Sequence, residues 1–142
     1  MATYNLALIR TAIKGILEGV SGLAYVYDRR NPIVEGYPCA IMDISNNVND
    51  MLTNVENERK ITFTIWLIQE VGIMTMEEAN TSLDEITREA VEALEKRSNL
   101  TLGGLVDWIM PAEGKREEVS SPEGSAIWQI LNLDVRVTTS VL

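Results

Sequence analysis

Four carboxylates come closest to a reactive or metal-binding arrangement in this sequence. Asp50, Glu56 and Glu58 fall in one polar region of the chain, and Asp43 lies just before it. Carboxylate oxygens are the ligands that Mg²⁺ and Ca²⁺ accept in proteins. The spacing of these four residues matches no EF-hand loop, however, and a stretch rich in Asn and Asp is more often simply solvated. We therefore expect no metal site and no cofactor.

The residue types that carry most enzyme chemistry are missing or isolated. The chain contains no histidine, which removes the commonest general base and the commonest transition-metal ligand. Its one cysteine, Cys39, stands in the apolar run PCAIM, where a small buried thiol is the expected role. No glycine-rich phosphate loop and no nucleophile elbow occurs. The sequence thus predicts a protein without a catalytic site, which is not an enzyme.

Composition limits the possible partners. The chain has 142 residues, of which 21 are acidic and 12 basic, and its net charge is −9. This balance argues against nucleic acid, because affinity for nucleic acid comes largely from Lys and Arg side chains at phosphates. No apolar run approaches the roughly 18 residues of a membrane span, and the N-terminus lacks the pattern of a signal peptide. We expect one domain, residues 1–142, that is made in a cytoplasm and contacts no membrane.

Hydrophobic periodicity predicts two helices. Apolar residues at three- and four-residue steps from about Tyr4 to Val20 indicate an amphipathic helix. A second helix is expected over residues 75–97, where Thr75 and Glu78 fit a capping box. Two pairs on this second helix have the spacing of i,i+4 ion pairs, namely Asp84–Arg88 and Glu92–Lys96.

Five segments have the alternation or the β-branched composition of strands. They are residues 23–28, 38–45, 59–70, 105–110 and 125–138. Apolar residues occur on both faces of segment 59–70, so both faces of the sheet should be at least partly covered. The charged segment 111–124 is expected to be an exposed loop. The order α-β-β-β-α-β-β predicts an α+β domain with a mainly antiparallel mixed sheet and two helices packed on it.

A long polar stretch, Ser45–Arg59, separates the second and third predicted strands. It contains five asparagines and three acids and is longer than a hairpin turn requires. The residues alone leave an extended hairpin, a loop and a short helix open. Asparagine is a poor helix former, which favours the hairpin. A helix also fits because four apolar residues stand at i, i+3, i+4 and i+7: Val48, Met51, Leu52 and Val55.

Several stretches, taken in order, resemble the tail terminator proteins of long-tailed bacteriophages. They are the helix NLALIRTAIKGIL, the proline-led strand YPCAIMDIS, the strand RKITFTIWLIQ, the capped helix MEEANTSLDEITREAVEAL, the segment LGGLVDWIMP and the final AIWQILNLDVRVTTS. The likeness covers nearly the whole chain. It is a likeness of pattern and order, with no catalytic signature.

The resemblance implies a structural protein of the virion. Tail terminator proteins form a ring, usually a hexamer, that caps the tail tube, fixes its length and presents a surface for head joining. The implied partners are further copies of this chain in a homohexamer, the tail tube protein and the head connector protein. The implied location is the virion tail, after assembly in the host cytoplasm.

The resemblance also gives the polar stretch a role. It would be an extended hairpin that reaches a neighbouring subunit or the tail tube. The candidate interface residues are Val48, Asp50, Met51, Leu52, Val55, Glu56, Glu58 and Arg59.

Two other classes of protein fit the same sequence. One is another ring protein of the phage neck or tail, such as a connector or a tube subunit. The other is a monomeric α+β module that binds a small ligand between helix and sheet. The native mass in solution separates a monomer from a ring, and images of tails that lack the protein separate the ring proteins from one another.

Overall fold

A computed structural model describes residues 4–30, 33–72, 74–121 and 124–140 of the chain. The elements, in chain order, are α1 (Leu6–Glu18), β1 (Tyr25–Tyr27), β2 (Cys39–Met51), β3 (Glu56–Glu70), α2 (Met76–Glu95), the 3-10 helices η1 (Arg97–Asn99) and η2 (Leu102–Gly104), β4 (Trp108–Ser121) and β5 (Gly124–Ser140). The strands form one mixed sheet in the order β1-β2-β3-β5-β4, in which only β1 and β2 run parallel. The predicted α+β class and mixed sheet are confirmed. The predicted order is matched only in part, because η1 and η2 separate α2 from β4.

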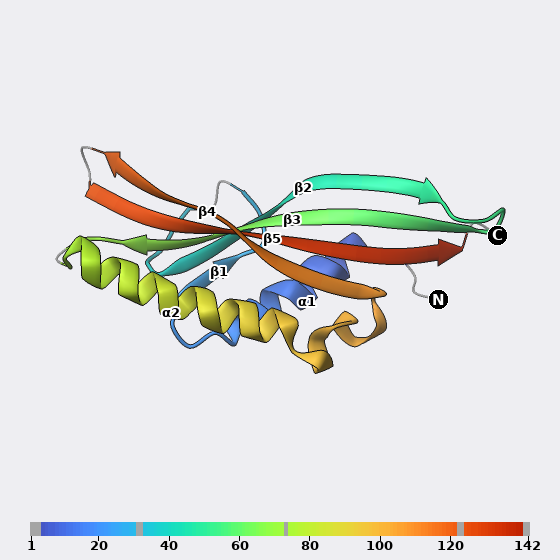
Figure 1. Cartoon of the computed structure of the whole chain (residues 1–142), viewed down its shortest axis with the longest axis horizontal. Coiled ribbons are helices and arrows are strands. Elements are labelled where there is room, and N and C mark those ends of the chain that lie inside the picture. The colour runs from blue at the N-terminus through green and yellow to red at the C-terminus, as the bar shows by residue number, and fades with distance from the viewer. Residues whose placement is uncertain (1–3, 31–32, 73, 122–123, 141–142) are drawn as a thin grey trace.

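Both α-helices lie against the same face of the sheet, which gives the protein two layers (Figure 1). The core between them is built from alternate residues of the strands and from one stripe of each helix. On β3, for example, Ile61, Phe63, Ile65 and Leu67 are fully buried. Their neighbours in sequence point to the other side and are half-buried. We call this second side, which the helices do not cover, the open face.

The open face is partly covered by the loop between β1 and β2, as the apolar residues on both faces of β3 predicted. The guanidinium of Arg30 lies 5.3 Å from the ring centre of Trp66 on the open face. The same guanidinium approaches the Asp43 carboxylate at 3.6 Å. Tyr27 accepts a hydrogen bond from the backbone N–H of Glu35 through its hydroxyl, at 2.8 Å. These contacts hold the loop over the open face at β1, β2 and part of β3.

Side-chain caps begin both helices. The Asn5 side chain accepts a hydrogen bond from the Leu8 N–H at 3.1 Å at the start of α1. The Thr75 hydroxyl accepts one from the Glu78 N–H, also at 3.1 Å, as the capping pattern predicted for α2. Each cap satisfies a backbone N–H that the first helical turn leaves without a partner.

The prediction of two i,i+4 ion pairs along α2 is wrong. The Arg88 guanidinium instead contacts Glu85 at 2.9 Å and Glu92 at 3.1 Å, so Glu92 is not available to Lys96. Asp84 pairs with Arg116, which reaches α2 from β4. The sequence spacing could not reveal this second pair because it joins two separate elements.

The described part of the charged segment 111–124 is not the predicted loop, and residues 122–123 lie outside the described residues. Residues up to Ser121 continue β4, which pairs with β5 as the edge strand of the sheet. The pairing shifts register between Glu113 and Arg116, which marks a β-bulge. Charged residues, a proline and a bulge are typical of edge strands, where they discourage pairing with other chains. The charged composition that predicted a loop is therefore that of an edge strand, which is protected against pairing with other chains.

The stretch between the second and third strands is the extended hairpin, which excludes the loop and helix alternatives. β2 runs to Met51 and β3 starts at Glu56, and cross-strand pairing continues to Met51 and Asn57. We call residues 46–60 the arm. It begins beyond a bulge at Ser45, whose hydroxyl donates to the Thr62 carbonyl at 3.1 Å. The arm extends past the ends of the helices, with the last residues of β5 beside it (Figure 1).

Candidate assembly interface

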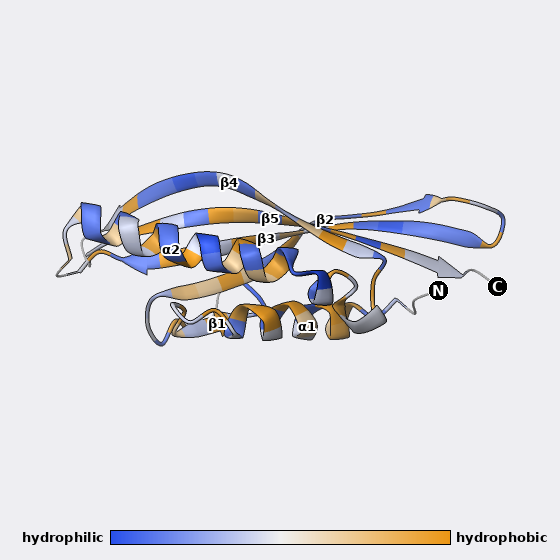
Figure 2. Ribbon diagram, turned by 60° about the horizontal axis from the view of Figure 1, so that its bottom comes forward, coloured by the Kyte–Doolittle hydropathy of each residue, from blue (hydrophilic) through white to orange (hydrophobic). Residues whose placement is uncertain are grey.

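The end of the arm is a tight turn that exposes apolar side chains. The backbone N–H groups of Leu52 and Thr53 both donate to the Glu56 carbonyl, at 3.0 and 3.1 Å. The Val55 N–H donates to the Thr53 hydroxyl at 3.2 Å. Met51 is 77% exposed, Leu52 52% and Val55 37%. We call residues 51–55 the tip. Figure 2 shows it as a hydrophobic end on an otherwise mostly hydrophilic hairpin.

Oppositely charged side chains of the arm lie close to one another. The Lys60 ammonium lies 3.2 Å from the Asp50 carboxylate and 3.8 Å from that of Glu58. Arg59 points to the helix side, with its guanidinium 4.4 Å from the ring centre of Tyr4. Glu56 pairs with Ser140 of β5 and is half-buried. Among the described residues, no group of three or more His, Cys, Asp and Glu side chains is arranged to hold a metal ion.

The predicted interface residues thus lie in three places: on the open face of the arm, on its helix side and at the tip. Val48 lies on the open face, in a cross-strand row with Lys60, Arg136 and Trp108. In this row the Arg136 guanidinium stacks 5.0 Å from the ring centre of Trp108. Met51, Leu52 and Val55 come together at the turn, whereas Arg59 is on the opposite side from Val48. The arm therefore ends in an apolar tip. Further back, on the open face, lies a row that contains the cationic side chains of Lys60 and Arg136 and the aromatic ring of Trp108.

A groove on the open face lies at the other end of the sheet. It has a volume of about 380 Å³. Cross-strand pairs bring its walls together, since Ile68 stands opposite Trp128 and Ala126 stands opposite both Glu70 and Val119. Tyr37, from the loop before β2, closes one side. Burial raises the pKa of Tyr37, with smaller contributions from Cys39, Glu70 and Tyr27, so its hydroxyl stays neutral at physiological pH.

The sequence did not reveal this groove as a site. Its residues come from four separate segments: the loop before β2, the end of β3, the end of β4 and the start of β5. Periodicity places Ile68 and Trp128 in strands but does not indicate that they are adjacent. The only signal in the sequence is that both faces of β3 carry large apolar residues.

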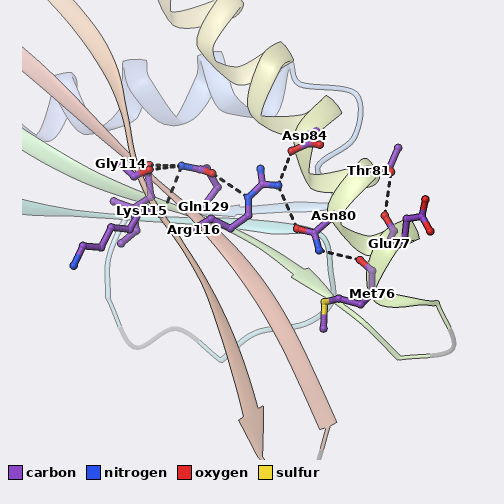
Figure 3. Close-up of polar contacts among 10 residues, drawn as sticks. Met76, Glu77, Asn80, Thr81, Asp84, Gly114, Lys115, Arg116 and Gln129 are labelled. Carbon is purple, nitrogen blue, oxygen red and sulfur yellow. Dashed lines mark hydrogen bonds and ion pairs between the residues drawn. The ribbon is translucent and has the colours of Figure 1, made fainter.

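A polar network fixes the outer half of β4 against α2. Figure 3 shows the Arg116 side chain between the two elements. Its guanidinium donates to the Asp84 carboxylate at 2.5 Å, to the Asn80 side-chain carbonyl at 3.3 Å and to that of Gln129 at 3.1 Å. Gln129 is buried and in turn donates to the Gly114 carbonyl at 2.9 Å, within the β4 bulge. This network holds the strand that carries Val119, one wall of the groove.

The groove wall also contains a side-chain contact between β4 and β5. The indole N–H of Trp128 donates to the Glu117 carboxylate at 3.0 Å. Glu117 stands opposite Trp128 across the strand pair. A hydrogen bond to an ionised carboxylate is stronger than one to a neutral acceptor. This bond holds the indole of Trp128 half-buried beside Ile68. The groove is thus apolar and aromatic inside, with the carboxylates of Glu70 and Glu117 beside it.

Comparisons with protein-family models and with curated protein sequences return no match to this chain. None of the described helices combines the length and the apolarity needed to cross a bilayer.

Proposed function

We propose that this protein is a structural component of a bacteriophage virion that forms a homohexameric ring on the tail tube. The ring ends tail elongation and presents the surface that joins the tail to the head. Its partners are the tail tube protein and the head connector protein. The resemblance of the ordered sequence elements to tail terminator proteins is one support for this function.

One structural observation carries the proposal most directly. The arm projects beyond the helical layer and ends in exposed apolar residues, of which Met51 is 77% exposed (Figure 1). Contiguous exposed apolar groups on a soluble surface typically mark an interaction site. A projecting hairpin of this kind is suited to reach a second molecule, because it does not contribute to the core of its own subunit.

The alternative of a small-ligand module between helix and sheet is less well supported. The facing residues of α2 and β3 include Leu83, Ile65 and Phe63, all fully buried, so side chains fill this part of the space. A hollow of about 240 Å³ does lie between α2 and the β4–β5 side of the sheet, but charged and polar residues make up most of its lining. A connector or tube subunit is the other ring-protein alternative, and images of tails that lack this protein separate it from a tail terminator.

Shortening the arm tests the proposal. The pairing of Asp50 with Glu58 allows residues 51–57 to be replaced by Asn-Gly without changing the strand register. The wild-type chain of 15.8 kDa should form six-chain rings, in solution at high concentration or on tail tubes. The shortened chain should melt within about 1 kcal/mol of the wild type, because the removed residues are mostly exposed.

Electron microscopy of tails assembled with each protein supplies the functional measurement. Wild-type protein should give tails of uniform length that join heads, and the shortened chain should give tails of uncontrolled length or tails that join no heads. Normal tails made with the shortened chain would contradict a role for the arm. A wild-type chain that stays single at millimolar concentration and forms no ring on tubes would contradict the function itself.

A further inference from the structure

The exposed tip and the groove lie at opposite ends of the same sheet. The tip closes the β2–β3 hairpin at one end of the elongated molecule, and the groove lies beside the β4–β5 end (Figure 1). Neither can reach the other within one chain, because the length of the sheet separates them. Two different, complementary surfaces on one molecule produce head-to-tail association, which closes into a ring or continues as a filament.

The size of the groove matches the tip. A cavity of about 150 Å³ lined by apolar side chains holds one benzene molecule. The groove, at about 380 Å³, therefore has space for the two most exposed tip side chains, those of Met51 and Leu52. Its walls of Ile68, Trp128 and Val119 provide apolar contact for them. Met is flexible enough to adapt to an irregular aromatic surface.

Charge favours this pairing over the symmetric ones. Two grooves placed together would bring the Glu70 and Glu117 carboxylates of both copies close to one another, which is repulsive. The tip, in contrast, contains no charged residue from Met51 to Val55. The nearest charged groups behind the tip on the open face are the carboxylates of Asp50, Glu56 and Glu58, two of which Lys60 contacts at 3.2 and 3.8 Å. Arg136 of β5 stands beside Lys60, so this part of the surface carries less uncompensated negative charge than a second groove would.

Arg136 is available for such a contact. Its guanidinium stacks on Trp108 and donates to the Val135 carbonyl, and among the described residues no carboxylate forms an ion pair with it. Because Lys60 and Arg136 offset the carboxylates of Asp50 and Glu58, the uncharged tip approaches an acidic neighbour with less repulsion than a second groove would.

We propose that the tip of one copy, Met51–Val55, inserts into the groove of the next copy between Trp128 and Val119. The inference rests on the proposed ring, for which it identifies the contact between subunits. A specific, stable interface buries roughly 800 Å² on each partner, which is more than a five-residue turn offers. The contact is therefore expected to be weak in isolation and to depend on protein concentration until the ring closes.

Two variants and their mixture test the contact. The tip variant carries Met51→Asp and Leu52→Asp, and the groove variant carries Val119→Asp at a residue that is 37% exposed. Each should weaken association at least about 10-fold, and the tip variant about 100-fold, because a charge replaces a buried apolar contact. The matched control is Leu8→Asp, a residue that is 50% exposed on α1 and belongs to neither surface.

The native mass of each sample is measured by sedimentation at concentrations where the wild type forms oligomers. The two variants should be single chains alone, and Leu8→Asp should behave as the wild type. An equal mixture of the two variants contains one intact tip and one intact groove, so it should form pairs and nothing larger. Rings formed by the tip variant would overturn the inference while leaving the proposed function intact. A mixture that stays single-chained would equally overturn it.

Cross-linking identifies the contact without relying on loss of association. Leu52→Cys combined with Val119→Cys should give a ladder of disulfide-linked multimers when a copper–phenanthroline oxidant is added. The native Cys39 is fully buried and does not interfere. The single variant Val119→Cys should give no ladder. A double variant that yields no ladder, under conditions where it still forms rings, would show that the rings use another contact. A wild type that forms no oligomer in solution and no ring on tail tubes would instead refute the proposed function.

Discussion

Replacing Arg116 by Met should destabilise the fold by about 2 kcal/mol. Met keeps a long side chain but removes the donors that bind Asp84 and Gln129. The ion pair is a small part of the loss, because the Asp84 side chain is 66% exposed and exposed pairs contribute about 0.2–1 kcal/mol. Gln129 is only 6% exposed, and leaving its buried side-chain oxygen without a donor costs about 1–3 kcal/mol.

Urea unfolding of the variant measures this loss. With a denaturant dependence of about 2 kcal/mol per molar, the midpoint should fall by roughly 1 M. Asp84→Asn, which removes only the charge, should cost less than about 1 kcal/mol. The double variant Arg116→Met/Gln129→Leu should cost about 1 kcal/mol less than the sum of the single changes, because both residues belong to one network. Equal costs for Asp84→Asn and Arg116→Met would show that Gln129 does not need this donor, and the reasoning would be wrong.

Three further predictions concern stability. Thr75→Ala should lower the free energy of unfolding by about 1 kcal/mol through loss of the α2 cap, whereas Thr81→Ala, in the exposed middle of the same helix, should change it by less than about 0.5 kcal/mol in thermal melts. Burial raises the pKa of the Cys39 thiol from about 9 to about 11. The unfolded chain therefore releases this proton at lower pH, so stability should fall between about pH 9 and pH 11, and Cys39→Ala should remove that part of the decline measured by urea titration at each pH. Gly22→Ala should cost about 1–3 kcal/mol, because its new methyl group would lie 2.7 Å from Ile86, and normal melting of this variant would mean that Ile86 can move aside.

The helices and the inner strands follow from the sequence because their patterns are strong. Residues 4–20 and 75–97 carry apolar stripes at helical spacing, and the observed α1 and α2 lie within those limits. The residues of β3 alternate between buried and half-buried, as expected for a strand with one face against the helices. These signals are local, so no knowledge of distant contacts is needed to interpret them.

The sequence gives a wrong prediction for the outer part of β4, because charged residues are typical both of loops and of edge strands. Pro111 and Gly114 lie within β4, although the same two residue types are typical of loops, and most of the strand's outer residues are exposed. Proline and charge are used both by loops and by edge strands that must not pair with other chains. Only the long-range pairing with β5 distinguishes the two cases, and a local pattern does not contain it.

The candidate interface was predictable in part. The four apolar residues of the polar stretch identify the tip, and three of them do gather at the turn. The groove could not be predicted, because Tyr37, Ile68 and Trp128 become neighbours only when the sheet assembles. Short-range composition therefore identifies a projecting element, whereas the surface that would receive it depends on topology.

The central strand pair has a consequence for how this protein is made. β3 and β5 pair along their whole lengths, joining residues 56–70 to residues 126–140. A ribosome must therefore release residues up to about 140 before this strand pair can form along its whole length. Until then the β3 edge of the β2–β3 hairpin is unpaired, which is a feature of an aggregation-prone intermediate. Such a high separation between paired residues also slows folding. We expect the rate of β5 docking, more than the final stability, to limit the yield of native subunits.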